Sequence, residues 1–270
     1  MINLKNYIIE SILDIEDNID NIDESIKDQI KQFLNNNFKN ASNCIISKKP
    51  NKDGKFEVSS NGDIEVKNKS ITSLTNGLFI WTNIKGNFIC SDCTLLTSLE
   101  GAAKEVDRDF NCSWCESLTS LEGAPEKVGG DFDCEHCKSL TSLEGAPKEV
   151  GGNFNCFNCN SLTSLEGAPK EVGGYFSCEY CNSLTSLEGA PKEVGRYFNC
   201  RKCNSLTSLK GAPKEVKGSF YCYDCKSLIS LEGAPKEVGG NFNCYQCGIV
   251  FTTDDVEKVS KVRGKIQVLH

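Results

Sequence analysis

Histidine is scarce in this sequence, which contains only His136 and the terminal His270. The chain also lacks a G-x-S-x-G motif, a phosphate-binding glycine loop and an H-E-x-x-H motif. These motifs are typical of nucleophilic, phosphoryl-transfer and zinc-hydrolase chemistry. Carboxylates such as Glu122 and Glu144 recur at one position of a repeat, which is typical of a solvated surface. We therefore expect a protein that is not an enzyme and has no cofactor.

The chain also lacks an excess of positive charge and a long hydrophobic run. Its 37 acidic and 30 basic residues give a net charge of −7, whereas nucleic-acid binding depends on basic surface that releases counterions. No stretch is apolar over the ~18 residues that a membrane span requires. The first residues, MINLKNYIIESILDIED, do not have the basic start and cleavage site of a signal peptide. We expect a cytoplasmic protein with reduced thiols and no nucleic-acid or membrane partner.

Cysteine, by contrast, is abundant and regularly placed. Sixteen of the 17 cysteines form C-x-x-C pairs, and only Cys44 lies outside them. The unit DFDCEHCKSLTSLEGAPKEV, residues 131–150, recurs with small changes every 22 residues. The first cysteines of the pairs are Cys90, Cys112, Cys134, Cys156, Cys178, Cys200, Cys222 and Cys244. A period of this length predicts a solenoid in which each coil buries its apolar side against its neighbours.

The pattern within one unit predicts which side chains form the core. Phe132 and Cys134 alternate with acidic residues, as in a short strand with one buried face. Leu140 and Leu143 follow at spacings that return them to the interior. In the degenerate segment GDIEV, Val66 stands where regular units have the first cysteine, so that position accepts an apolar side chain.

The segments outside the regular units predict four regions. Residues 1–50 form a helical segment and linker, because apolar residues recur every three or four positions up to Phe33. One long helix, two helices in a hairpin and a short coiled-coil dimer remain open for this segment. Residues 51–87 form an N-terminal module with a hairpin at Asn61 and Gly62 and degenerate repeats. Residues 88–247 are the regular repeats, and residues 248–270 form a capping helix with Asp254 as its N-cap.

These units resemble a known family. The pattern F-x-C-x-x-C-x-x-L-T is similar to the strand motif of cysteine-containing leucine-rich repeats. The longer string LTSLEGAPKEVGGxFxC, with the GDIEV module, is similar to repeat proteins encoded by bacteriophages. The resemblance covers residues 56–270 and implies an α+β repeat solenoid, a leucine-rich-repeat-like coil with a parallel β-sheet on one face. It also implies a role in recognition, and a second cysteine that hydrogen-bonds backbone inside the bend.

A metal site is the main alternative for the cysteines. The spacing C-x2-C-x18-C-x2-C is that of a four-thiolate zinc site, with Cys134, Cys137, Cys156 and Cys159 as candidates. However, the pattern continues without grouping the coils in pairs, and Val66 replaces a cysteine. We therefore predict that the thiols are core residues and that no metal is bound, with a zinc-bearing structural protein as the alternative.

The repeats differ from one another mainly at outward strand positions, where six of the seven tyrosines lie. Aromatic side chains on an exposed sheet offer large contact area at low entropic cost. We therefore expect a recognition protein that binds another protein, a host factor in the host cytoplasm if the chain is phage-encoded. Two alternatives are a virion or assembly component and stacking that only stabilises the sheet; the oligomeric state is left open. The predicted binding residues are Trp114, His136, Phe157, Tyr175, Tyr180, Tyr197, Arg201, Lys202, Tyr221, Tyr223 and Tyr245.

Overall fold

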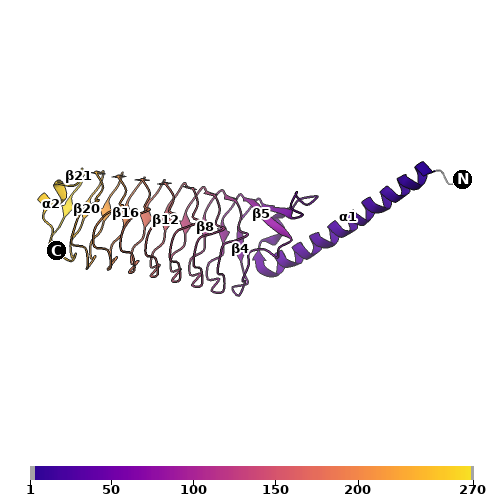
Figure 1. The fold of residues 1–270 in the computed structure, drawn as a ribbon, viewed down its shortest axis with the longest axis horizontal. Coiled ribbons are helices and arrows are strands. Elements are labelled where there is room, and N and C mark those ends of the chain that lie inside the picture. Colours follow the sequence, from indigo (N-terminus) through magenta and orange to yellow (C-terminus); the bar gives the residue numbers. More distant parts are fainter. Residues whose placement is uncertain (1–3, 269–270) are drawn as a thin grey trace.

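A computed structural model describes residues 4–268, and within the first helix it describes side chains from residue 19 onward. The chain forms a parallel β-solenoid whose coils stack in a row, with a helix projecting from one end (Figure 1). Two sheets of 11 strands each run along the solenoid. The prediction of one sheet on one face is therefore incomplete, because each 22-residue unit contributes two short strands.

The first sheet, sheet A, carries the phenylalanine of each unit, and the second, sheet B, carries the E-V dipeptide. Sheet A consists of β1 (Phe38–Lys39), β4 (Ile64–Val66), β6 (Phe88–Ile89), β8 (Phe110–Asn111), β10 (Phe132–Asp133), β12 (Phe154–Asn155), β14 (Phe176–Ser177), β16 (Phe198–Asn199), β18 (Phe220–Tyr221), β20 (Phe242–Asn243) and β22 (Ile266–Gln267). Sheet B consists of β2 (Cys44–Ile46), β3 (Phe56–Ser60), β5 (Phe79–Ile84), β7 (Glu105–Val106), β9 (Lys127–Val128), β11 (Glu149–Val150), β13 (Glu171–Val172), β15 (Glu193–Val194), β17 (Glu215–Val216), β19 (Glu237–Val238) and β21 (Lys261–Val262).

Glycine makes the corner between the two sheets. In the unit that follows β11, a Cβ atom on Gly151 would lie 2.2 Å from the carbonyl oxygen of Gly129 in the preceding coil. A side chain on Gly151 would therefore require a local shift of the backbone, whereas Asp107, Lys217 and Arg263 stand at the equivalent position in other coils. The Gly-Gly pair lets the chain leave sheet B and return to the phenylalanine strand within a few residues.

The core consists of ladders of identical side chains, as the alternation in the sequence predicts. Phe132, Cys134, Leu140 and Leu143 are fully buried, and their equivalents in neighbouring regular units are buried as well. The phenylalanine rings from Phe88 to Phe242 follow one another with centroids 5.1–5.5 Å apart. Because each ring is covered on both sides by its neighbours, the coils stabilise one another, as in other solenoids.

The N-terminal end is closed by a single helix and two antiparallel edge strands. The helix α1 (Leu4–Asn37) is continuous. Of the alternatives left open for this segment, it therefore forms one long helix and not a hairpin of two. Its C-terminal half covers the first coil with Ile30 and Leu34. The predicted linker contains β1, the 3₁₀ turn η1 (Ala41–Asn43) and β2; β1 and β2 pair antiparallel with β4 and β3. The predicted hairpin is wrong, because β3 and β4 belong to different sheets.

The C-terminal end contains a much shorter helix than expected over residues 248–270. The helix α2 (Thr253–Glu257) has five residues, and its capping box is formed by Thr252 and Asp255 instead of Asp254. The segment after it forms β21 and β22, which add one more coil to the two sheets. Within residues 4–268, neither helix combines the length and apolar character that crossing a bilayer requires.

Candidate functional site

The eleven predicted binding residues lie on sheet A and on the C-x-x-C turn that follows it. We call this set the aromatic face. Trp114 is 40% exposed, and the other ten are half-buried. They occupy four outward positions of the unit, at three and one residues before the first cysteine and at one and two residues after it. The structure thus brings all eleven to one side of the solenoid, between the coils of Cys112 and Cys244.

One part of the aromatic face is a row of contacts across successive turns. Trp114 stacks on His136 with ring centroids 3.8 Å apart. Phe157 contacts His136 edge-on at 5.2 Å and Tyr180 at 5.4 Å. The Nζ atom of Lys202 lies 4.6 Å from the centroid of the Tyr180 ring and donates a hydrogen bond of 2.5 Å to its hydroxyl. Five consecutive coils therefore contribute to one row of side chains.

The other part is a row of tyrosines nearer the C-terminal end. Tyr175 stacks on Tyr197 at 4.7 Å, and Tyr197 contacts Tyr221 edge-on at 5.8 Å. Tyr221 meets Tyr223 edge-on at 6.4 Å, and Tyr223 stacks on Tyr245 at 4.6 Å. Aromatic pairs at these distances each contribute ~0.5–1.5 kcal/mol beyond burial of their area. The rings are thus held in fixed positions on the surface.

A buried carboxylate anchors the centre of the aromatic face. Glu179 is 6% exposed and accepts a hydrogen bond of 2.9 Å from Asn199 Nδ2. Arg201 forms an ion pair with Glu179 and donates a hydrogen bond of 2.5 Å to the hydroxyl of Tyr223. Burial lowers the pKa of Arg201, but the hydrogen bonds to Glu179 and Tyr223 outweigh it and raise this pKa above its usual value. The guanidinium is therefore a fixed positive charge.

Burial also changes the titration of other residues near this face. It raises the pKa of Tyr175 to about 12, with a further contribution from Tyr197. Burial raises the pKa of Asp133 to about 6, against hydrogen bonds from the backbone of Glu135 and from Asn155 that lower it. The Asp133 carboxyl therefore changes its charge nearer to neutral pH than a free aspartate does.

The turn that carries Trp114, His136, Tyr180 and Lys202 has a left-handed backbone. Their φ angles lie between 58° and 60°, a region that side chains other than Asn and Asp rarely adopt. Sequence reasoning placed these residues on a strand and missed the turn. The signal was present, because Asp92, Asn158 and Asp224 occupy the same position in other units.

The cysteine thiols bond to backbone carbonyls. The thiol of Cys159 donates to the carbonyl of Cys134 in the preceding coil at 3.2 Å, and six other second cysteines make the same bond at 3.1–3.3 Å. The thiols of Cys134 and Cys156 donate to carbonyls of the following coil. Cys137 bonds like Cys159. In the part of the chain that the structure describes, no group of three or more His, Cys, Asp or Glu residues is arranged to hold a metal ion.

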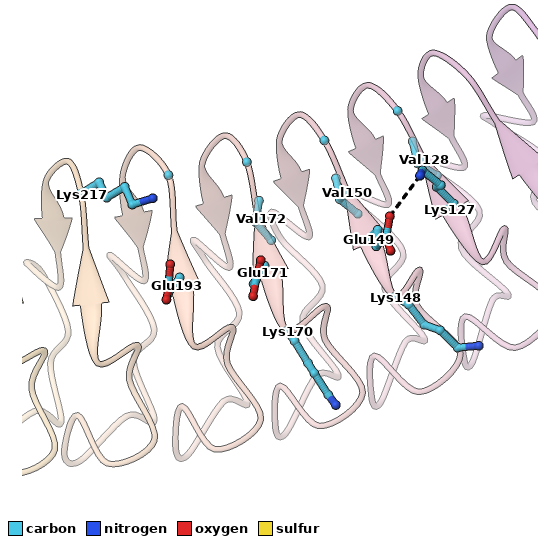
Figure 2. Close-up of a pocket in the computed structure, with 14 residues that line it drawn as sticks. Lys127, Val128, Lys148, Glu149, Val150, Lys170, Glu171, Val172, Glu193 and Lys217 are labelled. Atoms are coloured by element: carbon cyan, nitrogen blue, oxygen red, sulfur yellow. Dashed lines mark ion pairs between the residues drawn. The ribbon is translucent and has the colours of Figure 1, made fainter.

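A second surface feature, which sequence reasoning missed, is a shallow groove of about 720 Å³ on sheet B. Figure 2 shows the side chains that line it, which come from successive E-V strands and the residues beside them. Gly129, Gly151 and Gly173 are among its lining residues, and Lys217 stands at its C-terminal end (Figure 2). It is lined mainly by charged side chains and short stretches of backbone.

Glutamates form a row along this groove. The parallel register places Glu171 beside Glu149 and Glu193. Glu149 pairs with Lys127 at 3.2 Å (Figure 2), whereas Glu171 and Glu193, both within the described residues, form no ion pair. Neighbouring like charges weaken a sheet slightly, and the lysines beside them keep the whole surface mixed in charge.

Comparisons with known proteins add no family to this description. No family model, no curated protein and no solved structure matches this chain.

Proposed function

We propose that this chain is a recognition protein that binds another protein through its aromatic face. The observation that supports this proposal is the pair of ring rows, one from Trp114 to Tyr180 and one from Tyr175 to Tyr245, in which rings are packed side by side yet remain partly exposed. Aromatic and arginine side chains dominate the binding energy of protein interfaces. Rings that are already held in place lose little freedom when a partner covers them.

The dimensions of the aromatic face suit a protein partner. Seven coils contribute to it, and at ~4.8 Å between neighbouring strands it is roughly 29 Å long. A standard interface buries ~800 Å² on each partner, which a face of this length and of ordinary width can supply. Arg201 and Lys202 lie at its centre, where Glu179 pairs with Arg201 and Asp224 lies 3.9 Å from Lys202. They therefore offer a partner mainly hydrogen-bond donors and contact area instead of uncompensated charge.

The resemblance to cysteine-containing leucine-rich repeats and to phage-encoded repeat proteins forms part of the proposal. It supports a role in recognition, and for a phage-encoded chain it favours a host factor in the host cytoplasm as the partner. No catalytic residue follows from it. The stacking of the rings also stabilises the sheet, so an experiment must separate binding from stability.

The repeats themselves supply substitutions that the fold tolerates. Asn158 occupies the position of Trp114 and Tyr180, and Asn153 occupies the position of Tyr197. A variant with Trp114→Asn, Tyr180→Asn and Tyr197→Asn therefore removes three rings but keeps residues that other coils already use. The matched control carries Lys148→Ser and Lys170→Ser on sheet B, both exposed and away from the aromatic face.

The test begins with capture of a partner from a cell lysate by the immobilised protein, followed by a measurement of the Kd with the purified partner. Loss of three interface rings is expected to raise the Kd about 100-fold or more. The Kd of the control variant is expected to stay near that of the unchanged protein. Unfolding curves of both variants show whether they are folded. Equal Kd values for the folded aromatic variant and the unchanged protein would refute the proposal.

A further inference from the structure

The outermost strand of sheet B has one free edge. This strand is β2, and within residues 4–268 its one neighbour in the sheet is β3, to which it pairs antiparallel. The N–H of Ser47 donates to the carbonyl of Glu57 at 2.8 Å, so the hydrogen-bonded pairs of this ladder are Ser47 with Glu57 and Ile45 with Ser59. The N–H and C=O of Ile46 therefore point away from β3. Among the described residues they have no hydrogen-bond partner, which leaves a template for another strand.

A groove of about 510 Å³ lies along this edge, between β2 and the C-terminal half of α1. Leu34 of the helix is buried, and the side chains of Cys44 and Ile46 are half-buried on the core side of β2. These three residues give the groove an apolar lining. In a strand added beside β2, every second side chain would point to this side of the sheet. The groove therefore offers space for the apolar side chains of an added strand.

The charge around the groove favours an acidic partner. Residues 38–55, which connect α1 to β3, contain five lysines and a single acid, Asp53, although the whole chain has a net charge of −7. Four of these lysines are exposed and form no ion pair with any described residue: Lys48, Lys49, Lys52 and Lys55.

The lysines also reach the groove itself. Lys48 lines it together with Lys27 and Lys31 of α1, and none of its described lining residues is acidic. The two helix lysines pair with acids of their own helix, but exposed pairs of this kind are weak. Carboxylates of an added strand therefore meet cations beside the edge, whereas a basic strand would be repelled.

Two simpler interpretations of this edge fit the structure less well. Proteins often protect an edge strand with charged residues or proline within it, but β2 reads Cys-Ile-Ile and Ile45 is 52% exposed. Lysines also attract the phosphates of nucleic acids, but a phosphate backbone does not pair with the free carbonyl of Ile46 or fill an apolar groove. A peptide backbone uses both the N–H and the C=O of a sheet edge.

We propose that β2 binds an extended acidic segment of another protein, which adds a strand to the N-terminal end of sheet B. The backbone of this segment pairs with Ile46, its apolar side chains enter the groove beside Leu34, and its carboxylates lie near the lysines of residues 48–55. The site lies at the end of the solenoid where α1 leaves it (Figure 1). It shares no residue with the aromatic face, so this proposal does not depend on that face.

The first test measures the binding of a short probe peptide to the full chain. The end-blocked, fluorescently labelled peptide Glu-Val-Glu-Val-Glu-Val alternates carboxylates with apolar side chains, and Lys-Val-Lys-Val-Lys-Val is its control. The acidic peptide is expected to bind with a Kd of about 10–100 µM, and the basic peptide about tenfold more weakly or less. No binding of the acidic peptide up to about 1 mM, or tighter binding of a single-stranded oligothymidylate of about 12 nucleotides, would overturn the proposal.

Hydrogen exchange of the backbone separates strand addition from attraction by charge alone. At a concentration of acidic peptide about ten times its Kd, exchange of the Ile46 N–H is expected to slow about tenfold, because this N–H gains a partner. The exchange is followed by NMR of the isotope-labelled protein. The N–H of Ile45 already faces β3 and serves as the internal control. Binding that leaves the exchange of Ile46 unchanged would show that no strand is added.

Two variants at Ile46 complete the test. Ile46→Pro removes the outward N–H at a position of an edge strand where proline is tolerated, and Ile46→Val keeps this N–H as the matched control. Ile46→Pro is expected to raise the Kd of the acidic peptide about tenfold or more, and Ile46→Val to change it by about twofold or less. Urea unfolding shows whether both variants are folded, and equal Kd values for folded Ile46→Pro and the unchanged protein would refute the proposal. The variant that lacks three rings of the aromatic face should bind the peptide as the unchanged protein does, so failure at one site is distinguishable from failure at the other.

Discussion

Asp133 offers the sharpest test of how the coils are built, because other coils show which residue fits best at its position. The backbone N–H of Glu135 donates a hydrogen bond of 2.9 Å to Asp133 Oδ1. Equivalent positions in four other regular units hold asparagine, at Asn111, Asn155, Asn199 and Asn243. In the unit of Asn155, the N–H of Phe157 donates the same bond to the amide oxygen at 3.2 Å. Asp133→Asn should therefore keep the turn and remove only the buried charge.

The pKa of Asp133 gives the expected size of the effect. Burial raises this pKa from 3.8 to about 6 in the folded chain. A carboxyl group whose pKa is higher when folded destabilises the folded state as the pH rises from about 4 to about 6, and the full penalty is present at pH 7. The difference corresponds to at most about 3 kcal/mol at pH 7, and partial exposure reduces it to about 1–2 kcal/mol.

Urea unfolding of both proteins at pH 7 and pH 4 measures this. Asp133→Asn is expected to raise the free energy of unfolding by about 1–2 kcal/mol at pH 7 and by about 0.5 kcal/mol or less at pH 4. At pH 4 the folded state is protonated at Asp133 and the unfolded state is only about half ionised, so little of the penalty has developed. The same gain at both pH values would mean that the charge is not the cause. A loss of stability at pH 7 would show that the carboxylate makes a contact that an amide cannot replace.

Three further predictions concern the turns and the thiols. Gln246 is exposed with φ 55°, so Gln246→Gly should raise the free energy of unfolding by up to ~1 kcal/mol and Gln246→Val should lower it by ~1–2 kcal/mol in urea titrations. Gly151→Ala places a methyl group on a backbone carbonyl and should lower the melting temperature through a loss of about 1–3 kcal/mol. Burial raises the pKa of Cys44 to about 11 and that of Cys247 to about 12, and the other 15 thiols are buried. Ellman's reagent at pH 8 should therefore label the native protein slowly and all thiols quickly only after unfolding; rapid native labelling of many thiols would contradict the buried ladders.

The sequence predicts the buried side chains of the solenoid better than it predicts the strands of sheet B and the N-terminal edge strands. Alternation at Phe132 and Cys134 identified the buried side chains, because burial of one face leaves a period of two in the sequence. The E-V strands were missed because two residues are too short to show any period. The N-terminal edge strands β1 and β2 were missed for a different reason: they bond to the sheets through their backbones, and their composition of Asn and Lys suggested a loop.

The C-terminal coil shows how a degenerate repeat can imitate a helix. Val256, Val259, Val262 and Ile266 are spaced three and four apart, as on a helix face. The structure instead pairs Val262 with Val238 and Ile266 with Phe242. Aligning KVRGKIQV with EVGGNFNC gives this register directly. For the aromatic face, the sequence indicated which residues share a side of the sheet, but the ring contacts depend on the left-handed turns.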